Sequence, residues 1–352
     1  MNIGVLGRII LTILGLGFLI FIHELGHFWV AKILHIRVYE LVLGYGPKLF
    51  SFTLGETVYG VAAVPLGGYV RLEDIKPEDI SLREERLPVL GDQPLWKRIC
   101  VLFGGPFMNF LIPVFLIAII FMLGVPSLTT TVEGVISGYP AAEAGFKKGD
   151  KIISVEGNKI ETWDKVTEII KENPNKTLKF TVQRSDNKVT IDVKTAEKDG
   201  AGFLGVAARA DIKKFGIFSA FYQGFKVTLE SIWITLKFLF LIIVGKIPEG
   251  LNAKVIGPVG LVKEISVGIQ EGLMVYLGIL AQMSIGLGIA NLIPIPPLDG
   301  GKLAFIGYEF IAKKPLKIKT MLVLQSIGIA LLVFLMVMVT FSDIFGFFVM
   351  GG

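Results

Sequence analysis

Long apolar runs are the feature that most constrains what this chain can fold into. Three uncharged runs each reach the length of about 20 residues that a helix needs to cross a bilayer: residues 99–132, 272–298 and 320–342. A fourth run, 9–31, is interrupted only by His23, Glu24 and His27. Hydrophobic residues make up 53% of the 352 residues and charged residues only 18%, against about 25% in soluble domains. The sequence therefore excludes a disordered chain and predicts a membrane protein with four spanning helices.

The charges beside these runs predict the orientation of the chain. Lys and Arg gather between the first and second runs and again between the last two, and such loops face the cytoplasm. Residues 231–245 are apolar but are punctured by Lys237 and flanked by Lys226 and Lys246, which favours an amphipathic helix in the interface over a fifth span. The net charge of +5 includes no basic block typical of a nucleic-acid-binding arm, and the single cysteine, Cys100, excludes an intrachain disulfide.

Two stretches outside the runs have the alternation of strands. Residues 41–52 and 57–72 contain turn glycines and predict short hairpins that lie against the membrane. From about residue 128 to 209 the chain resembles a compact soluble domain. We expect a helix at 163–171 and strands at 130–136, 151–155, 178–183 and 188–193.

The order of these elements and the pattern from Ala144-Gly145-Phe146 to Gly149-Asp150 resemble a PDZ domain of the bacterial, circularly permuted kind. PDZ domains capture extended peptides by strand addition, often at a C-terminal carboxylate. The resemblance implies that the carboxylate-binding loop is Gly202, Phe203, Leu204 and Gly205. The alternative, a PDZ fold that serves only as a steric plug, stays open.

The chemistry lies in the first run, in the sequence His23-Glu24-Leu25-Gly26-His27. Residues four apart share a helix face, so the two histidines can bind one metal ion. Glu24 is placed to act as the general base toward a water at that metal, which zinc suits best. Charged and polar groups inside a span are costly, so a group of three without a function is not expected.

A third ligand must come from elsewhere in the chain. The remaining histidine, His35, lies beyond the span end and is expected at the interface. Asp299 is the better candidate because it follows a run broken by prolines, where irregular backbone can line a cavity. His27 and Asp299 reach the same leaflet only if residues 231–245 do not cross, which again favours four spans.

The His-Glu-x-x-His motif, the PDZ-like pattern and Asn291-x-x-Pro-x-Pro-x-Leu-Asp299-Gly together resemble the site-2 protease family of intramembrane zinc metalloproteases. The match is closest to the bacterial, PDZ-containing regulators of sigma factors. It implies that His23, His27 and Asp299 bind Zn²⁺ and that Glu24 activates water. It also implies substrate-binding roles for these residues: Asn109, Asn291, Gly67, Gly68 and Tyr69.

The expected fold is a membrane α-helical protein with four transmembrane helices, an inserted extracytoplasmic α+β PDZ domain and membrane-associated cytoplasmic β-hairpins. Its parts are expected in this order: first helix at 1–34, hairpin region at 35–98, second helix at 99–126, PDZ domain at 127–210, interfacial amphipathic helices at 211–270, third helix at 271–311, and a cytoplasmic loop with the fourth helix at 312–352. Pro126 is expected to end the second helix.

The predicted function is therefore zinc-dependent cleavage within a membrane. The resemblance implies a bacterial plasma-membrane location and a single-pass membrane protein as substrate, already trimmed by another protease, such as an anti-sigma factor or a remnant signal peptide. Two departures are visible: Lys302 stands where relatives often have His, and the chain has room for one PDZ domain. The main alternative is an inactive membrane PDZ scaffold with a structural metal site; a metal transporter would need more intramembrane ionisable residues than this chain has.

Overall fold

A computed structural model describes residues 4–72, 90, 93–246 and 257–350. Within these ranges, four helices are long and apolar enough to cross a membrane: α1 (Val5–Ile33), α2 (Leu95–Leu123), α7 (Leu273–Leu292) and the part Ile318–Phe345 of α9 (Ile318–Met350). The prediction of four apolar spans is thereby confirmed. Helix α5 (Ile217–Ile243), which contains most of the stretch expected in the interface, is not among the four.

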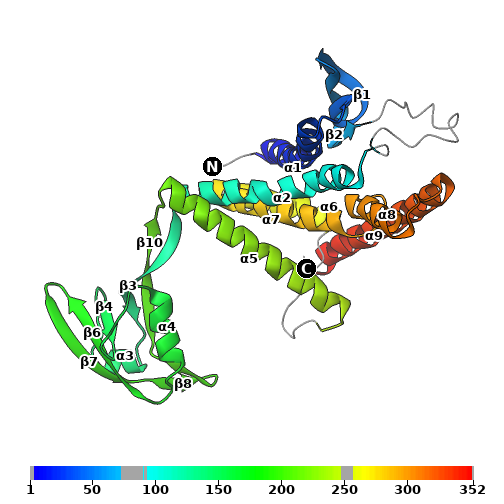
Figure 1. The fold of residues 1–352 in the computed structure, drawn as a ribbon. Helices are drawn as coiled ribbons and strands as arrows, with labels where there is room; N and C mark the ends of the chain where they lie inside the picture. The colour runs from blue at the N-terminus through cyan, green and yellow to red at the C-terminus, as the bar shows by residue number, and fades with distance from the viewer. Residues whose placement is uncertain (1–3, 73–89, 91–92, 247–256, 351–352) are drawn as a thin grey trace. The chain divides into compact units, whose positions relative to one another are not determined.

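The chain divides into two compact units (Figure 1). One unit, Leu123–Phe215, is here called the PDZ-like unit, and it is slightly longer than the predicted 127–210. The other, here called the helical unit, consists of Met1–Met122 and Gly216–Gly352. Each unit has its own packed interior, and each is described by itself below.

The PDZ-like unit is built on a six-stranded sheet with the order β10-β3-β4-β6-β7, in which β5 pairs with β4. The strands are β3 (Val125–Val135), β4 (Lys151–Val155), β5 (Asn158–Lys159), β6 (Thr177–Arg184), β7 (Asn187–Lys194) and β10 (Val206–Lys213). A separate two-stranded ribbon joins β8 (Ala196–Lys198) to β9 (Ala201–Phe203). The helices are α3 (Pro140–Glu143) and α4 (Trp163–Lys171). The predicted strand and helix at 151–155 and 163–171 are confirmed at both ends.

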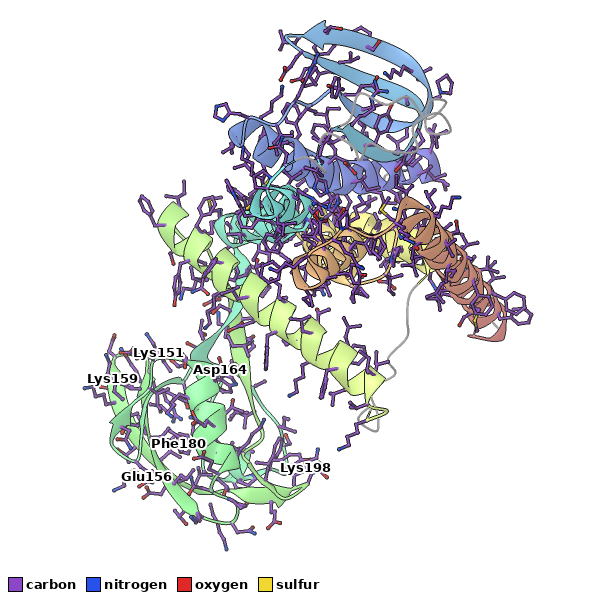
Figure 2. All side chains as sticks on the ribbon, turned by 45° about the vertical axis from the view of Figure 1, so that its right-hand side comes forward. Lys151, Glu156, Lys159, Asp164, Phe180 and Lys198 are labelled. Atoms are coloured by element: carbon purple, nitrogen blue, oxygen red, sulfur yellow. The ribbon has the colours of Figure 1, made fainter. Side chains whose placement is uncertain are left out.

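An apolar core explains why this unit folds. Alternate residues of β6 are buried because strand side chains alternate between the two faces of a sheet, and Val166 and Ile170 of α4 are buried because residues four apart share one helix face. Phe180 is fully buried, whereas the five charged residues labelled with it in Figure 2 are all exposed. Sequence alternation and helical periodicity therefore place the core as expected.

One carboxylate is buried in this unit. Asp150 accepts hydrogen bonds of 2.8 Å from both Nε and Nη2 of Arg184, and one of 2.9 Å from the Lys147 amide. Burial by itself would raise the pKa of Asp150, but the hydrogen bonds from Arg184 and the backbone outweigh it and hold that pKa below its usual value. The Gly149-Asp150 turn is thus fixed to β6 by an ion pair.

The hairpin region of the helical unit differs from the prediction of separate short hairpins. It forms two strands of 15 residues each, β1 (Glu40–Leu54) and β2 (Thr57–Arg71), that pair with each other. The first residues of β1, Glu40 to Leu43, lie between two parts of β2, facing Val58–Val61 on one side and Gly68–Arg71 on the other. The alternation indicated strands correctly, but it could not reveal that one stretch pairs twice.

Two helix boundaries also differ from the prediction. Helix α2 begins at Leu95, ahead of the uncharged run, and ends at Leu123 before Gly124, which has a φ of +114° that favours glycine. Pro126 lies in β3 and does not end the helix. The expected third span at 271–311 is α7, followed by a break and then by α8 (Asp299–Ala312). Helix α6 (Pro258–Glu271) precedes α7 and lies within the region expected to hold amphipathic helices.

A charged residue in the last apolar helix was not anticipated. Asp343 of α9 is buried, and its carboxylate accepts hydrogen bonds from the amides of Gly257 (3.3 Å) and Gly260 (2.8 Å). These amides stand at the N-terminus of α6, where the first backbone N–H groups of a helix have no intrahelical partner. Asp343 therefore caps α6 from a helix far along the chain.

Candidate metal centre

Helix α1 brings His23 and His27 onto one face. They are four residues apart, both are buried, and their Nε2 atoms lie 3.1 Å from each other. Their rings meet edge to face, with centroids 4.8 Å apart. The arrangement is the one expected from the spacing of the motif on a helix.

Asp299 reaches the same point from α8. It is the first residue of that helix, directly after the proline-containing break, and it is buried. Its Oδ2 atom lies 3.1 Å from Nε2 of His23 and 3.1 Å from Nε2 of His27. The side chain expected to complete the group is therefore next to both histidines, although 272 residues separate it from His27 (299 − 27).

The three atoms form a triangle whose sides all measure 3.1 Å. In a tetrahedral zinc site with ligands at about 2.0–2.1 Å, neighbouring ligand atoms stand roughly 3.3 Å apart. The donor set, two imidazoles and one carboxylate, is one that zinc uses in catalytic sites with a fourth position open. The residues present therefore fit this metal. Among the described residues, no other group of three such side chains converges in this way.

Each of the three side chains is held from behind. His27 Nδ1 donates to the backbone carbonyl of Val101 at 2.8 Å, and His23 Nδ1 lies 3.0 Å from the side-chain amide of Asn109. Lys302 donates from Nζ to Oδ1 of Asp299 at 3.2 Å, which leaves Oδ2 facing the histidines. Such outer contacts fix the orientation of metal ligands.

Glycine allows α2 to approach the histidines. A Cβ atom built on Gly105 would overlap His27 Nε2 and would lie 2.7 Å from His23 Cε1. At the adjacent residues, a Cβ on Gly26 would overlap the carbonyl oxygen of Gly104. The backbones of α1 and α2 therefore cross in direct contact beside the triangle.

Glu24 lies beside this group and is half-buried. It lines a cavity of about 350 Å³ together with His23, His27, Asn291, Asp299 and Lys302. Ligand-binding cavities have volumes of about 300–1,000 Å³, so this one is large enough to admit part of a substrate. The general base expected from the motif therefore faces a space beside the three converging side chains.

One end of β2 borders the same cavity. Gly68 and Tyr69 line it, and a Cβ built on Gly68 would lie 3.3 Å from Glu24 Cγ. The Tyr69 hydroxyl donates to Glu40 at 3.0 Å, and Arg71 donates to the same carboxylate at 2.8 Å. Glu40 thus ties this end of β2 to β1, with Gly67 buried beside Tyr45. The role of this segment toward a substrate stays a prediction.

The two asparagines implied by the resemblance differ in position. Asn291 is half-buried and lines the cavity. Asn109 is fully buried: its side-chain amide is hydrogen-bonded to His23, and its backbone carbonyl accepts a hydrogen bond from Ser284. Substrate contact is therefore sterically open to Asn291, whereas the buried Asn109 contacts a histidine instead; both roles stay predictions.

The predicted carboxylate-binding loop lies in the PDZ-like unit, at the end of β9 and before β10. The carbonyl of Leu204 accepts from the Ala141 amide at 3.0 Å, and that of Gly205 accepts from Ile136 at 2.9 Å. The Phe203 ring packs edge to face on Tyr139. Binding of a peptide there stays a prediction.

Four residues contribute contacts to the centre that the sequence analysis does not assign: Val101, Lys302, Gly105 and, in its contact with His23, Asn109. The carbonyl of Val101 belongs to the backbone and has no signal in the sequence. Lys302 stands three residues after Asp299, and residues three apart on a helix are neighbours, so its spacing could have indicated the contact. Gly105 and Asn109 are four apart on α2, which could have placed both on the face toward α1.

Comparison with known proteins gives matches along nearly the whole chain. The family model of peptidase family M50 matches residues 11–335. The zinc metalloprotease RasP of Oceanobacillus iheyensis is 28% identical over 421 residues, covering 96% of this chain and 98% of that protein. The regulator of sigma-W protease RasP of Bacillus subtilis is 29% identical over 418 residues, covering 96% and 98%.

Among solved structures, the chain is similar to the PDZ domain of an SdrC-like protein from Listeria monocytogenes. The identity is 23% and the TM-score is 0.22, over 24% of this chain and 90% of that one.

Proposed function

Because the chain belongs to peptidase family M50 and is a zinc-dependent intramembrane metalloprotease, we propose that it hydrolyses a peptide bond in or near the transmembrane segment of a single-pass membrane protein. We further propose that His23, His27 and Asp299 bind the zinc ion and that Glu24 is the general base. The observation that carries the proposal is the triangle of three ligand atoms, 3.1 Å apart, beside Glu24 and a cavity.

Glu24 performs the proton transfers. When bound, zinc acts as a Lewis acid that polarises the scissile carbonyl and acidifies the attacking water. Glu24 accepts the proton of that water and then delivers it to the leaving amine, as general acid-base catalysis requires. Its half-buried position supports this role, because the side chain lines the cavity beside the three converging ligand atoms.

The end of β2 holds the substrate in an extended form. A peptide bond in a transmembrane helix is shielded by the helix hydrogen bonds, and a lipid environment offers no replacement for them. Residues Gly68 to Arg71 pair with β1 on one side, and strand addition on the other side would satisfy an unwound substrate backbone. The position of Gly68 against Glu24 would then present the substrate to the general base.

Asn291 contributes from the same cavity. It lines this space together with Glu24, and its side-chain amide can donate to a substrate carbonyl. The resemblance also implied this role for Asn109, but its burial supports a different one, which is argued in the next subsection.

The distribution of basic residues supports an orientation in the bacterial plasma membrane. Lys32 lies in the last turn of α1, Arg37 follows that helix, and Lys97 and Arg98 lie in the first turn of α2. Such clusters of basic residues favour the cytoplasmic side. The metal centre then lies toward the cytoplasmic leaflet, near the hairpin strands, and the PDZ-like unit lies outside the cytoplasm.

The substrate is a protein that another protease has already shortened. The PDZ-like unit would act as a filter against a large outer domain, or it would bind the new C-terminus at residues Gly202, Phe203, Leu204 and Gly205. A relative named regulator of sigma-W protease supports an anti-sigma factor as the substrate class, with remnant signal peptides as the second class.

Cleavage by reconstituted protein tests this proposal. A tagged single-pass substrate without its outer domain is incorporated into vesicles with the wild-type chain, with Glu24→Gln, or with the control Glu264→Gln, which changes an exposed glutamate of α6. Wild type and the control should cleave, and a zinc chelator should stop both. Glu24→Gln should lose about 10²–10⁴-fold in rate while it keeps its zinc.

Two results would contradict the proposal. Loss of zinc from Glu24→Gln would show that this carboxylate is a ligand and not the base. No cleavage of several such substrates by the zinc-loaded wild type would favour the membrane scaffold.

A further inference from the structure

We propose that Asn109 is a positioning residue of the metal centre. Its side-chain carbonyl accepts the Nδ1–H of His23 and thereby keeps the Nε2 lone pair of that ring directed at the point where three ligand atoms converge. This inference rests on the proposed ligand set and deepens it. It also replaces a substrate-binding role for Asn109 with a role in orienting His23 through the Nδ1 atom of that ring.

The argument begins with His27, whose tautomer is determined by its surroundings. Its Nδ1 lies 2.8 Å from the carbonyl oxygen of Val101, and a carbonyl oxygen can only accept a hydrogen bond. Nδ1 therefore carries the hydrogen, and Nε2 has a free lone pair directed at His23 and Asp299. This is the form in which imidazole binds a metal.

His23 must adopt the same tautomer if it is to bind the same ion through Nε2. Its Nδ1 then carries the hydrogen and needs an acceptor. The side-chain amide of Asn109, 3.0 Å away, is the group that meets this atom. An amide has one end that accepts and one that donates, so only the carbonyl end matches the metal-binding tautomer.

The state of the amide supports this assignment. In the structure, Nδ2 lies next to His23 Nδ1, and Asn109 Oδ1 is buried without a hydrogen-bond partner. A buried acceptor without a partner costs roughly 1–3 kcal/mol. A half-turn about the Cβ–Cγ bond exchanges the two ends and gives the oxygen the Nδ1–H as its donor.

The position of Asn109 suits a fixed support and not a substrate contact. Its exposed fraction is 0%, so in this conformation no substrate can reach it. It stands one helical turn from Gly105, whose missing side chain lets α2 lie against both imidazoles. Its backbone carbonyl accepts from Ser284 Oγ at 2.8 Å, a contact that does not involve the amide.

Zinc affinity of the full-length protein tests the inference without any cleavage reaction. The dissociation constant is measured by chelator competition for wild type, Asn109→Leu, Asn109→Asp and the control Ser284→Ala. Asn109→Leu keeps the approximate size but removes the acceptor, so zinc binding should weaken 10- to 100-fold, the usual loss for such a contact. Asn109→Asp keeps an acceptor oxygen and should bind zinc within about threefold of wild type, as should Ser284→Ala.

Each other outcome has a definite meaning. Wild-type affinity in Asn109→Leu would overturn the inference, and so would equal losses in Asn109→Asp or Ser284→Ala, which would indicate packing alone. If Asn109→Leu does not fold, as judged by its unfolding temperature, Asn109→Ala takes its place and must show the same loss.

Kinetics separate this role from substrate binding. A positioning role lowers kcat and leaves KM nearly unchanged, whereas a substrate-binding role raises KM and leaves the zinc dissociation constant unchanged. His23→Ala tests the proposed ligand set separately from the role of Asn109. If His23→Ala binds zinc as tightly as wild type, His23 is not a ligand, and the proposed ligand set fails whatever the Asn109 variants show.

Discussion

Around the metal centre of the helical unit, four polar side chains are buried, those of His23, His27, Asn109 and Asp299, whereas the interior of the PDZ-like unit is an apolar cluster that includes Phe180. The exposed surfaces are reversed as well: α9 presents mostly apolar residues, and the strands of the PDZ-like unit present charges. Water drives the burial of apolar groups in one unit, and lipid cannot do so in the other. The helical unit must therefore be assembled by close packing and by polar contacts, which also form the site.

The comparison predicts that stability and metal binding can be altered separately. A change in the apolar cluster should lower the unfolding free energy of the PDZ-like unit and leave the zinc affinity unchanged. A change at the crossing of α1 and α2 should weaken zinc binding and leave the stability of the PDZ-like unit unchanged. The expected effects are given from the largest to the smallest.

Phe180→Ala should destabilise the PDZ-like unit by about 3–5 kcal/mol, because it leaves a cavity at the centre of the core. Pulse proteolysis of the full-length protein across a denaturant series measures the loss. Lys188→Ala, an exposed position on the neighbouring strand, serves as the control. Zinc affinity should equal that of wild type, and a parallel loss of zinc would show that the two units are coupled.

Gly105→Ala should weaken zinc binding on the order of 100-fold or more, because the added methyl group overlaps His27 and forces the imidazoles apart. Chelator competition gives the dissociation constant. Gly286→Ala in α7, where an added Cβ meets nothing within 4 Å, is the matched control and should bind zinc normally. Tight zinc binding by Gly105→Ala would disprove the close crossing.

Asp150→Asn should destabilise the PDZ-like unit by about 1–3 kcal/mol at neutral pH, because Arg184 loses its charged partner. The pKa of Asp150 is lower in the folded unit than in the unfolded chain, where it is about 3.9. The stabilisation is therefore complete well above pH 4 and is lost as the pH falls through the lowered value. The difference in unfolding free energy between wild type and variant should be constant near neutral pH and should shrink as the pH falls below about 4. A constant difference at all pH values would contradict the assignment.

Lys302→Met should change zinc affinity by less than about fivefold, because a half-exposed ammonium group contributes little to an ion pair. Lys302→Arg keeps the donor to Asp299 and should resemble wild type. If Lys302→Met but not Lys302→Arg lost zinc affinity tenfold, Lys302 would stabilise the position of Asp299 more strongly than its exposure indicates.

The parts of the fold that repeat a local pattern were predictable from the sequence. The bounds of α4 follow from its periodicity, and the spacing of His23 and His27 places them on one face of α1. The approach of Asp299 to these histidines could be inferred from two features: Asp299 follows a run broken by prolines, and it falls late in a run that crosses in the same direction as the run that holds His27.

The contacts that hold the centre from behind were not predictable in the same way. Val101 contributes a backbone carbonyl, and the pairing of Glu40 to Leu43 with two parts of β2 depends on how the strands fold back. Such contacts join residues distant in the chain, and neither periodicity nor residue type encodes the partner. The hydropathy pattern gives no sign that Asp343 is buried, because this residue follows the uncharged run that ends at Ser342.

The cap that Asp343 places on α6 has a practical consequence for shortening the chain. A version that stops after Ser342 keeps nearly all of the apolar length of α9, and by hydropathy it still contains a complete span. It loses, however, the carboxylate that satisfies the Gly257 and Gly260 amides, a contact of a kind that contributes about 1 kcal/mol in water. Unmet backbone groups cost several kcal/mol in lipid. The last position at which the gene can be trimmed is thus set by one polar contact and not by hydrophobic length.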